Sequence, residues 1–133
     1  MILDSNILIE IIQDPGSREA KWLGLAQASQ PMRCNPVIVA EIAANFTSLD
    51  HLTSFLRTFP LCNEPLSDRD CFRAGQAYLE YKRRGGARET ILPDFLIGGQ
   101  AAERGWTLVT RDRKGFESYF PDLTILDPLK DHA

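Results

Sequence analysis

Short apolar runs alternate with segments of helical periodicity along this chain, and the alternation restricts the folds open to it. The runs that read as strands lie at 2–3, 32–34, 106–110 and 124–126. Between them, apolar residues recur three or four positions apart, as on one face of an amphipathic helix. Strands that alternate with helices form parallel sheets whose two faces are covered. We therefore predict an α/β fold with a mostly parallel central sheet.

Turn and capping residues indicate where the helices begin and end. Asp4-Ser5-Asn6 suits a turn from strand to helix, and Asn35-Pro36 reads as the cap and first position of another helix. Ser67-Asp68-Arg69-Asp70 resembles a capping box, in which the first and fourth side chains bond to each other's backbone. Pro93-Asp94 opens a later helix, and Gly105 closes it. Two glycines inside that helix predict close packing against a neighbouring element.

Length and composition are those of one globular domain, which we expect to span residues 1–133. No apolar run is long enough to cross a bilayer, and the start has no positively charged region typical of a signal peptide. We expect a cytoplasmic protein with no membrane partner. The net charge of −3 disfavours nucleic-acid binding by bulk attraction. Three cysteines without a C-x-x-C spacing, and two distant histidines, argue against a zinc site or a disulfide framework.

Four carboxylates stand where buried segments start, end or turn: Asp4, Glu41, Asp94 and Asp112. Asp4 ends the first strand and Asp112 follows the clearest one, so both are expected at the carboxyl edge of the sheet, where ligands bind. Asp94 begins a helix, and Glu41 lies on or beside the apolar face of another. Converging carboxylates repel each other unless they share protons or hold a cation.

Carboxylate oxygens without histidine or cysteine are the ligands that suit Mg²⁺ or Mn²⁺. Such ions polarise a phosphate, generate hydroxide from bound water and stabilise a leaving alkoxide. The sequence therefore predicts a metal-dependent site that hydrolyses phosphodiesters. Each acid also has an alternative explanation that involves no metal. Asp4 and Asp94 could serve simply as helix caps, and Asp112 could be an ordinary turn residue. Glu41 could lie at the edge of the core with its carboxylate in solvent.

The chain resembles a PIN domain of the VapC toxin type. The resemblance is carried by Asp4-Ser5-Asn6, a helical Glu41, Pro93-Asp94-Phe95-Leu96-Ile97 and Thr110-Arg111-Asp112, in this order. It implies a Rossmann-like α/β/α sandwich and an Mg²⁺- or Mn²⁺-dependent endoribonuclease that acts as the toxin of a type II toxin–antitoxin pair. The acidic quartet then maps onto Asp4, Glu41, Asp94 and Asp112, with Asn6 and Thr110 as polar supports. The chain departs from many relatives at Gly115, where they carry another Asp before the Phe that matches Phe116.

The resemblance also implies partners. We expect an RNA substrate, and a cognate antitoxin whose basic segment places an Arg or Lys among the carboxylates. Arg111 adjoins the acids and is expected to position phosphate, whereas Lys82, Arg83 and Arg84 either contact RNA phosphates or favour the negative end of their helix. We expect a homodimer. Aromatic residues at core-like spacing lie either in the core or in its dimer face: Trp22, Phe55, Phe59, Phe72 and Tyr78.

Two other functions fit parts of the pattern. A non-catalytic PIN-like module that binds RNA or acts as a scaffold would be expected to lack members of the quartet, and all four are present. A phosphoryl-transfer or receiver-like domain also gathers carboxylates around Mg²⁺. It would need a second Asp beside the first, and Asp4 is followed by Ser5-Asn6 instead. The nuclease interpretation is therefore preferred.

Overall fold

The structure, a computed structural model, describes residues 1–88 and 91–131. Within these ranges five strands form one sheet: β1 Ile2–Leu3, β2 Met32–Cys34, β3 Leu61–Asn63, β4 Leu108–Val109 and β5 Ile125–Leu126. Their order across the sheet is β3-β2-β1-β4-β5, and every neighbouring pair is parallel. The prediction of an α/β fold with a mostly parallel sheet is confirmed.

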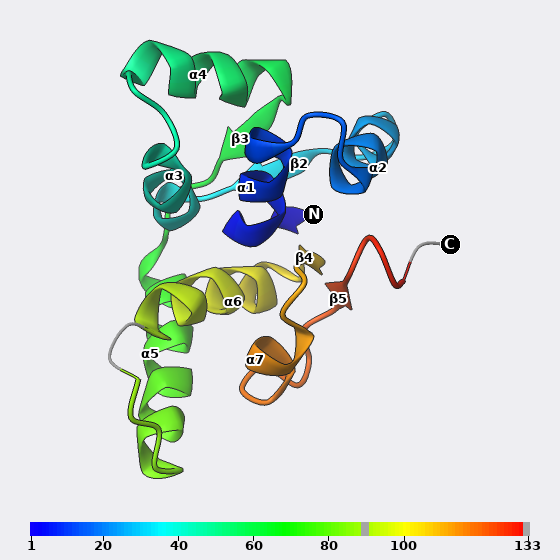
Figure 1. Cartoon of the computed structure of the whole chain (residues 1–133). Coiled ribbons are helices and arrows are strands. Elements are labelled where there is room, and N and C mark those ends of the chain that lie inside the picture. The colour runs from blue at the N-terminus through cyan, green and yellow to red at the C-terminus, as the bar shows by residue number, and fades with distance from the viewer. Residues whose placement is uncertain (89–90, 132–133) are drawn as a thin grey trace.

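Helices cover both faces of this sheet (Figure 1). They are α1 Ser5–Gln13, α2 Arg18–Ala26, α3 Pro36–Ala43, α4 Leu49–Thr58, α5 Asp68–Arg83, α6 Leu92–Arg104 and α7 Arg113–Glu117. In the view of Figure 1, α1 to α4 lie in the upper half of the molecule with β2 and β3, and α5 to α7 lie in the lower half with β5. Among the described residues, every helix is too short or too polar to cross a membrane.

The strand order reverses at β1, and this reversal defines the place where a ligand can enter. From β1 the chain steps outward to β2 and β3, and it then returns to the other side of β1 as β4. Helices leave the neighbouring carboxyl ends of β1 and β4 toward opposite faces of the sheet, which opens a crevice between them. Asp4 follows β1 directly, and Thr110 follows β4 directly.

The predicted caps are present. Asn35 accepts a hydrogen bond from the Ile38 amide, and Ser67 and Asp70 form the reciprocal capping box at the start of α5. Gly105 ends α6 with φ of 68°, a left-handed conformation that favours glycine. Asp70 also forms an ion pair with Arg104 at 2.8 Å, so the capped end of α5 is fixed to the last turn of α6.

Two elements escaped prediction. β3 is an edge strand whose residues are exposed or half-buried, so it has no apolar run to reveal it. Helix α7 has five residues, which is too few to show a helical period. The predicted strand at 106–110 is shorter than expected, because only Leu108–Val109 pairs with its neighbours.

Close packing by the α6 glycines is confirmed. An added Cβ at Gly99 would lie 2.9 Å from the Ala74 amide nitrogen of α5, and one at Gly98 would lie 2.6 Å from the Phe120 ring. Glycine therefore lets the α5 and α6 backbones approach each other directly. Helix α6 is held between α5 and the sheet, and this position fixes Asp94 in its first turn.

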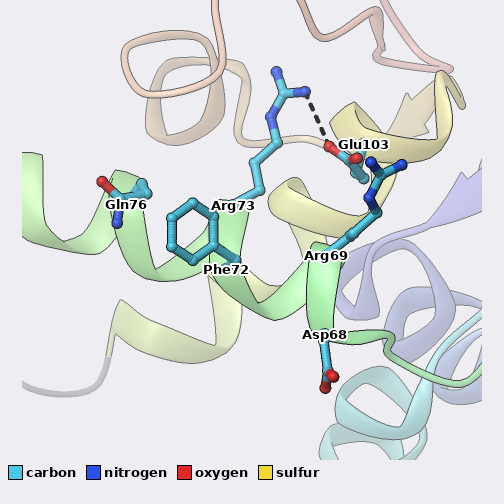
Figure 2. A pocket seen from close by; sticks show the side chains of 6 residues that line it. All are labelled: Asp68, Arg69, Phe72, Arg73, Gln76 and Glu103. Carbon is cyan, nitrogen blue, oxygen red and sulfur yellow. Dashed lines mark ion pairs between the residues drawn. The ribbon is translucent and has the colours of Figure 1, made fainter.

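The outer face of α5 carries an apolar side chain in solvent. Phe72 is 69% exposed, so the prediction that it lies in the core is wrong and the alternative, a dimer face, stays open. It borders a groove of about 500 Å³ whose rim includes Asp68, Arg69 and Glu103 (Figure 2). Leu79, two turns further along α5, is 43% exposed. Phe72 and Leu79 are seven residues apart and therefore lie on the same face of α5.

Candidate metal centre

Asp4 is the most buried member of the predicted quartet, with 4% of its surface exposed. It ends β1 and caps α1, because its Oδ1 accepts a hydrogen bond from the Ser5 amide at 2.8 Å. Its Oδ2 accepts a bond from the Thr110 hydroxyl at 2.7 Å. Both carboxylate oxygens are thus oriented by groups at the ends of the two adjacent strands.

Thr110 organises the polar supports around Asp4. Its hydroxyl accepts hydrogen bonds from the Asn6 side-chain amide at 3.2 Å and from the Asp112 backbone amide at 3.0 Å. The side-chain carbonyl oxygen of Asn6 in turn accepts a hydrogen bond from the Arg111 backbone amide at 3.4 Å. The two residues predicted as supports therefore contact each other, and they join the end of β1 to the segment that carries Asp112.

Glu41 and Asp94 face the crevice from helices α3 and α6. The Oε1 atom of Glu41 is buried, and it has no hydrogen-bond partner within residues 1–88 and 91–131. Such a group is costly unless a ligand or water satisfies it. Asp94 is half-buried in the first turn of α6.

A buried amide pair, which the sequence analysis did not predict, joins the helices that carry these two acids. The Asn35 side chain donates to Gln100 Oε1 at 3.0 Å, and Gln100 donates in turn to the Pro65 carbonyl at 3.1 Å. Asn35 begins α3, and Gln100 lies in the middle of α6. The only signal in the sequence was the capping role of Asn35, because its partner depends on how the helices pack.

The carboxylates act on one another electrostatically. Burial raises the pKa of Asp94 to about 6, with further increases from the charges of Glu41 and Asp112 and a decrease from Arg88. Burial likewise raises the pKa of Asp4 to about 6, with Asp94 and Glu41 adding to the effect and the bonds from Thr110 and Ser5 opposing it. All four predicted acids therefore contribute to one field at the strand-order reversal.

Asp112 forms the outer corner of this field. It is exposed, and its Oδ1 caps α7 by accepting a bond from the Gly115 amide at 3.2 Å. A Cβ atom at position 115 would lie 2.6 Å from Asp112 Oδ2. Because glycine has no side chain, the Asp112 carboxylate can occupy the space that a Cβ atom at position 115 would fill.

The residue types fit a divalent cation, although the acids are spread out. Nowhere in residues 1–88 or 91–131 do three Asp, Glu, His or Cys side chains lie close enough together to hold one ion. The fit rests instead on three features: oxygen ligands only, mutual repulsion that a cation would relieve, and the unpaired buried oxygen of Glu41. Oxygen ligands of this kind are those that hard divalent cations prefer.

Three of the four cations predicted to contact phosphate already contact protein groups. Arg111 is 44% exposed and lies 3.6 Å from buried Glu19 and 3.9 Å from Glu10. Arg84 forms an ion pair with Glu80, and Lys82 lies over the Tyr78 ring. The last turn of α5, which carries Lys82, Arg83 and Arg84, points away from the sheet in Figure 1.

A family model described as PIN domain matches residues 1–119. The chain belongs to the PIN-domain family. This membership agrees with the all-parallel sheet and with the position of the acids at its carboxyl edge. No curated protein sequence matches the chain.

Several solved structures are similar to this chain over nearly its whole length. VapBC2 from Rickettsia felis, bound to a DNA fragment from its promoter, has a TM-score of 0.75 at 22% identity and covers 94% of this chain and 96% of its own. DNA-bound VapBC from Salmonella typhimurium has a TM-score of 0.75 at 23% identity, with 96% of both chains covered. FitAcB from Neisseria gonorrhoeae has a TM-score of 0.69 at 21% identity, with 97% and 98% covered. At these identities the likeness shows a shared fold.

Proposed function

We propose that this protein is an Mg²⁺- or Mn²⁺-dependent endoribonuclease, a single domain over residues 1–133 that acts in the cytoplasm as the toxin of a type II toxin–antitoxin pair. The observation that carries the proposal is the mutual electrostatic influence of Asp4, Glu41, Asp94 and Asp112 at the reversal of strand order. PIN-domain membership and the toxin–antitoxin complexes of the same fold support it.

The four carboxylates would hold the metal, which when bound polarises the phosphate and lowers the pKa of a coordinated water. Thr110 and the Ser5 amide keep Asp4 ionised and fixed in direction, since hydrogen bonds to the charged form favour it. Asn6 holds the Arg111 backbone, and through it the turn that presents Asp112. Asn35 and Gln100 keep Glu41 opposite Asp94 by fixing α3 to α6.

We further propose that the partner is an antitoxin with a basic segment. The solved complexes of this fold include a toxin–antitoxin complex from Klebsiella pneumoniae, with a TM-score of 0.69 at 22% identity. A guanidinium or ammonium group inserted among the carboxylates would relieve the repulsion that raises the pKa of Asp4 and Asp94. It would thereby compete with the metal and inhibit cleavage.

The outer face of α5 is the proposed homodimer surface. Two copies of α5 packed antiparallel around Gly75 would place Phe72 of each copy against Leu79 of the other. The same register brings Asp68 of each copy to Arg83 of the other, so the charges at the ends of the face are complementary. This match between apolar and charged positions favours a second copy over a different partner.

The spread of the carboxylates favours a second candidate function, a non-catalytic PIN module that binds RNA or acts as a scaffold. One experiment separates the two. Purified protein is incubated with a mixed RNA pool in Mg²⁺, Mn²⁺ or EDTA, and Asp94→Asn protein prepared identically serves as the control for contaminating nuclease. Metal-dependent cutting that the substitution abolishes is the expected result. RNA that is bound but left intact by folded, antitoxin-free protein would support the non-catalytic module.

A further inference from the structure

A pocket of about 390 Å³ opens beside Asp112, which is one of the residues that line it. Its walls come from α7 and from the turn that follows β5, two segments that the sequence analysis left without a role. Basic side chains predominate among the residues that line it: Arg111, Arg113, Lys114 and Lys130. In a chain with net charge −3, cations gathered next to the acidic site need an explanation.

The pocket is a fixed feature of the fold. Arg113 donates a hydrogen bond to the Ile125 carbonyl at 3.3 Å and forms an ion pair with Asp131. Asp131 also accepts a bond from the Asp127 amide at 2.9 Å, and the Lys130 amide donates to the Asp127 carbonyl at 3.1 Å. These bonds hold the turn against α7, so that Lys114 and Lys130 line the pocket from separate segments.

Among the described residues, two of the four cations are engaged in ion pairs, and two are not. Arg111 pairs with Glu10 and Glu19, and Arg113 pairs with Asp131. Lys114 and Lys130 are exposed, and within residues 1–88 and 91–131 neither takes part in an ion pair.

Three acids share the lining with the four basic residues: Asp112, Glu117 and Asp127. Asp127 is only 6% exposed, and its Oδ1 is occupied by the Leu129 amide at 3.0 Å. Glu117 is exposed, and solvent screens its charge. Lys114 and Lys130 therefore share the pocket with two exposed carboxylates, Asp112 and Glu117.

Gly115 connects this pocket to the metal centre. With no side chain at that position, the Asp112 carboxylate lies in the space that a Cβ would fill. In this chain Asp112 is followed by Arg113-Lys114-Gly115, so two basic residues and no further carboxylate stand directly after it. The corner beyond Asp112 therefore carries two basic side chains of α7, Arg113 and Lys114.

We propose that the pocket binds a backbone phosphate of the RNA strand, next to the phosphate that is cleaved, with Lys114 and Lys130 as its cationic ligands. The proposal rests on the proposed nuclease function. Lysine binds phosphate as a flexible point charge, and such contacts set the position of a strand without reading its sequence. The pocket would hold the strand in register while the carboxylates act on the neighbouring phosphate. An acidic peptide segment of a protein partner is the competing occupant.

The test measures binding of a fluorescent single-stranded RNA pool to Asp94→Asn protein, which keeps the RNA intact, by anisotropy over a series of salt concentrations in Mg²⁺. Lys114→Ala with Lys130→Ala, added to this background, should lower the slope of log affinity against log salt by about 0.7, since the pocket neutralises one phosphate and each neutralised phosphate contributes about 0.7 for single strands. Lys21→Ala with Arg57→Ala removes the same charge from exposed positions on α2 and α4 and should leave the slope unchanged.

A matched cleavage assay, with Asp94 intact, separates this proposal from the nuclease function. The lysine pair should raise KM and leave kcat within about twofold, because a positioning contact is equal in the ground and transition states. An unchanged slope and an unchanged KM in protein that cuts RNA would overturn the phosphate pocket and leave the nuclease intact. A reduced slope in protein that never cuts RNA would support the pocket while refuting the nuclease. The phosphate pocket would also be overturned if the lysine substitutions abolished binding to an acidic peptide and left RNA binding unchanged.

Discussion

Replacing Asp94 by Asn should stabilise the metal-free protein while it abolishes cleavage. The Asp94 carboxylate is half-buried, and its charge is opposed by Glu41 and Asp112. Asn has nearly the same volume and no charge, so the substitution removes the repulsion and leaves the packing in place. A residue kept for metal binding at the expense of stability is expected to behave in this way.

The magnitude follows from the pKa of Asp94. An increase from 3.8 to about 6 corresponds to about 3 kcal/mol, at 1.36 kcal/mol per unit. Solvent reaches part of the side chain and screens the repulsion, so about 1–2 kcal/mol is a realistic gain. Loss of a first-turn acid weakens the helix-dipole interaction of α6 by about 0.3–1 kcal/mol. We expect a net gain of about 1 kcal/mol in the free energy of unfolding.

The gain should depend on pH in a defined direction. A raised pKa in the folded state favours the protonated form, so the contribution of Asp94 to stability is fully present below pH 3.8 and is lost as pH rises through about 6. Wild type and Asp94→Asn should therefore have similar stability near pH 4, where Asp94 is protonated in the folded state, and should differ fully above about pH 7. Urea unfolding in EDTA at both pH values measures this difference, which is a midpoint shift of about 0.5 M for a slope of about 2 kcal/mol/M.

Magnesium provides the second arm of the experiment. Wild type should gain about 2.7 kcal/mol when the metal concentration is about a hundredfold above its dissociation constant, and Asp94→Asn should gain far less. Asp50→Asn, which removes an exposed first-turn acid from α4, is the matched control and should show neither the gain in EDTA nor the loss of metal response. The reasoning would be refuted by an Asp94→Asn protein that is less stable than wild type at pH 7.5 in EDTA.

Three other predictions follow from particular contacts. Thr110→Val removes the hydroxyl that donates a hydrogen bond to Asp4, so the pKa of Asp4 should rise further. The acidic limb of the profile of kcat/KM against pH should then move to higher pH. A limb that does not move would show that ionisation of Asp4 does not control cleavage. Gly99→Ala forces a methyl group against the Ala74 backbone. The substitution should lower the free energy of unfolding in urea by about 1–2 kcal/mol, which is the cost of overpacking less the gain in helix propensity. Gly24→Ala, which has open space around it, should not lower the stability. Asp68→Arg and Arg83→Asp should each weaken a homodimer measured by light scattering, and the double substitution should restore it; failure of rescue would exclude the proposed register.

Much of the fold could be predicted from local signals. Asp4 and Asn35 stand where a strand gives way to a helix, and Gly105 ends α6 in a left-handed conformation that few other residues adopt. These residues are informative because their roles depend on neighbours within four positions. Edge strand β3 and the one-turn helix α7 lacked such signals, because neither buries enough apolar surface to show a period.

The candidate site also contains residues with local sequence signals and residues whose role depends on packing. This difference explains why its cations were harder to predict than its acids. A carboxylate next to an apolar run is already unusual in the sequence, so Asp4 and Glu41 could be proposed as ligands before any packing was known. A surface cation is ordinary, and its availability depends on which acid packs against it. Arg111 adjoins the acids in the sequence, yet Glu19 from α2 engages it, whereas Lys114 lies two residues from Asp112 and remains free among the described residues. Assigning phosphate contacts in proteins of this fold therefore requires the ion pairs of the folded chain, and proximity to the acidic motif in the sequence is not sufficient.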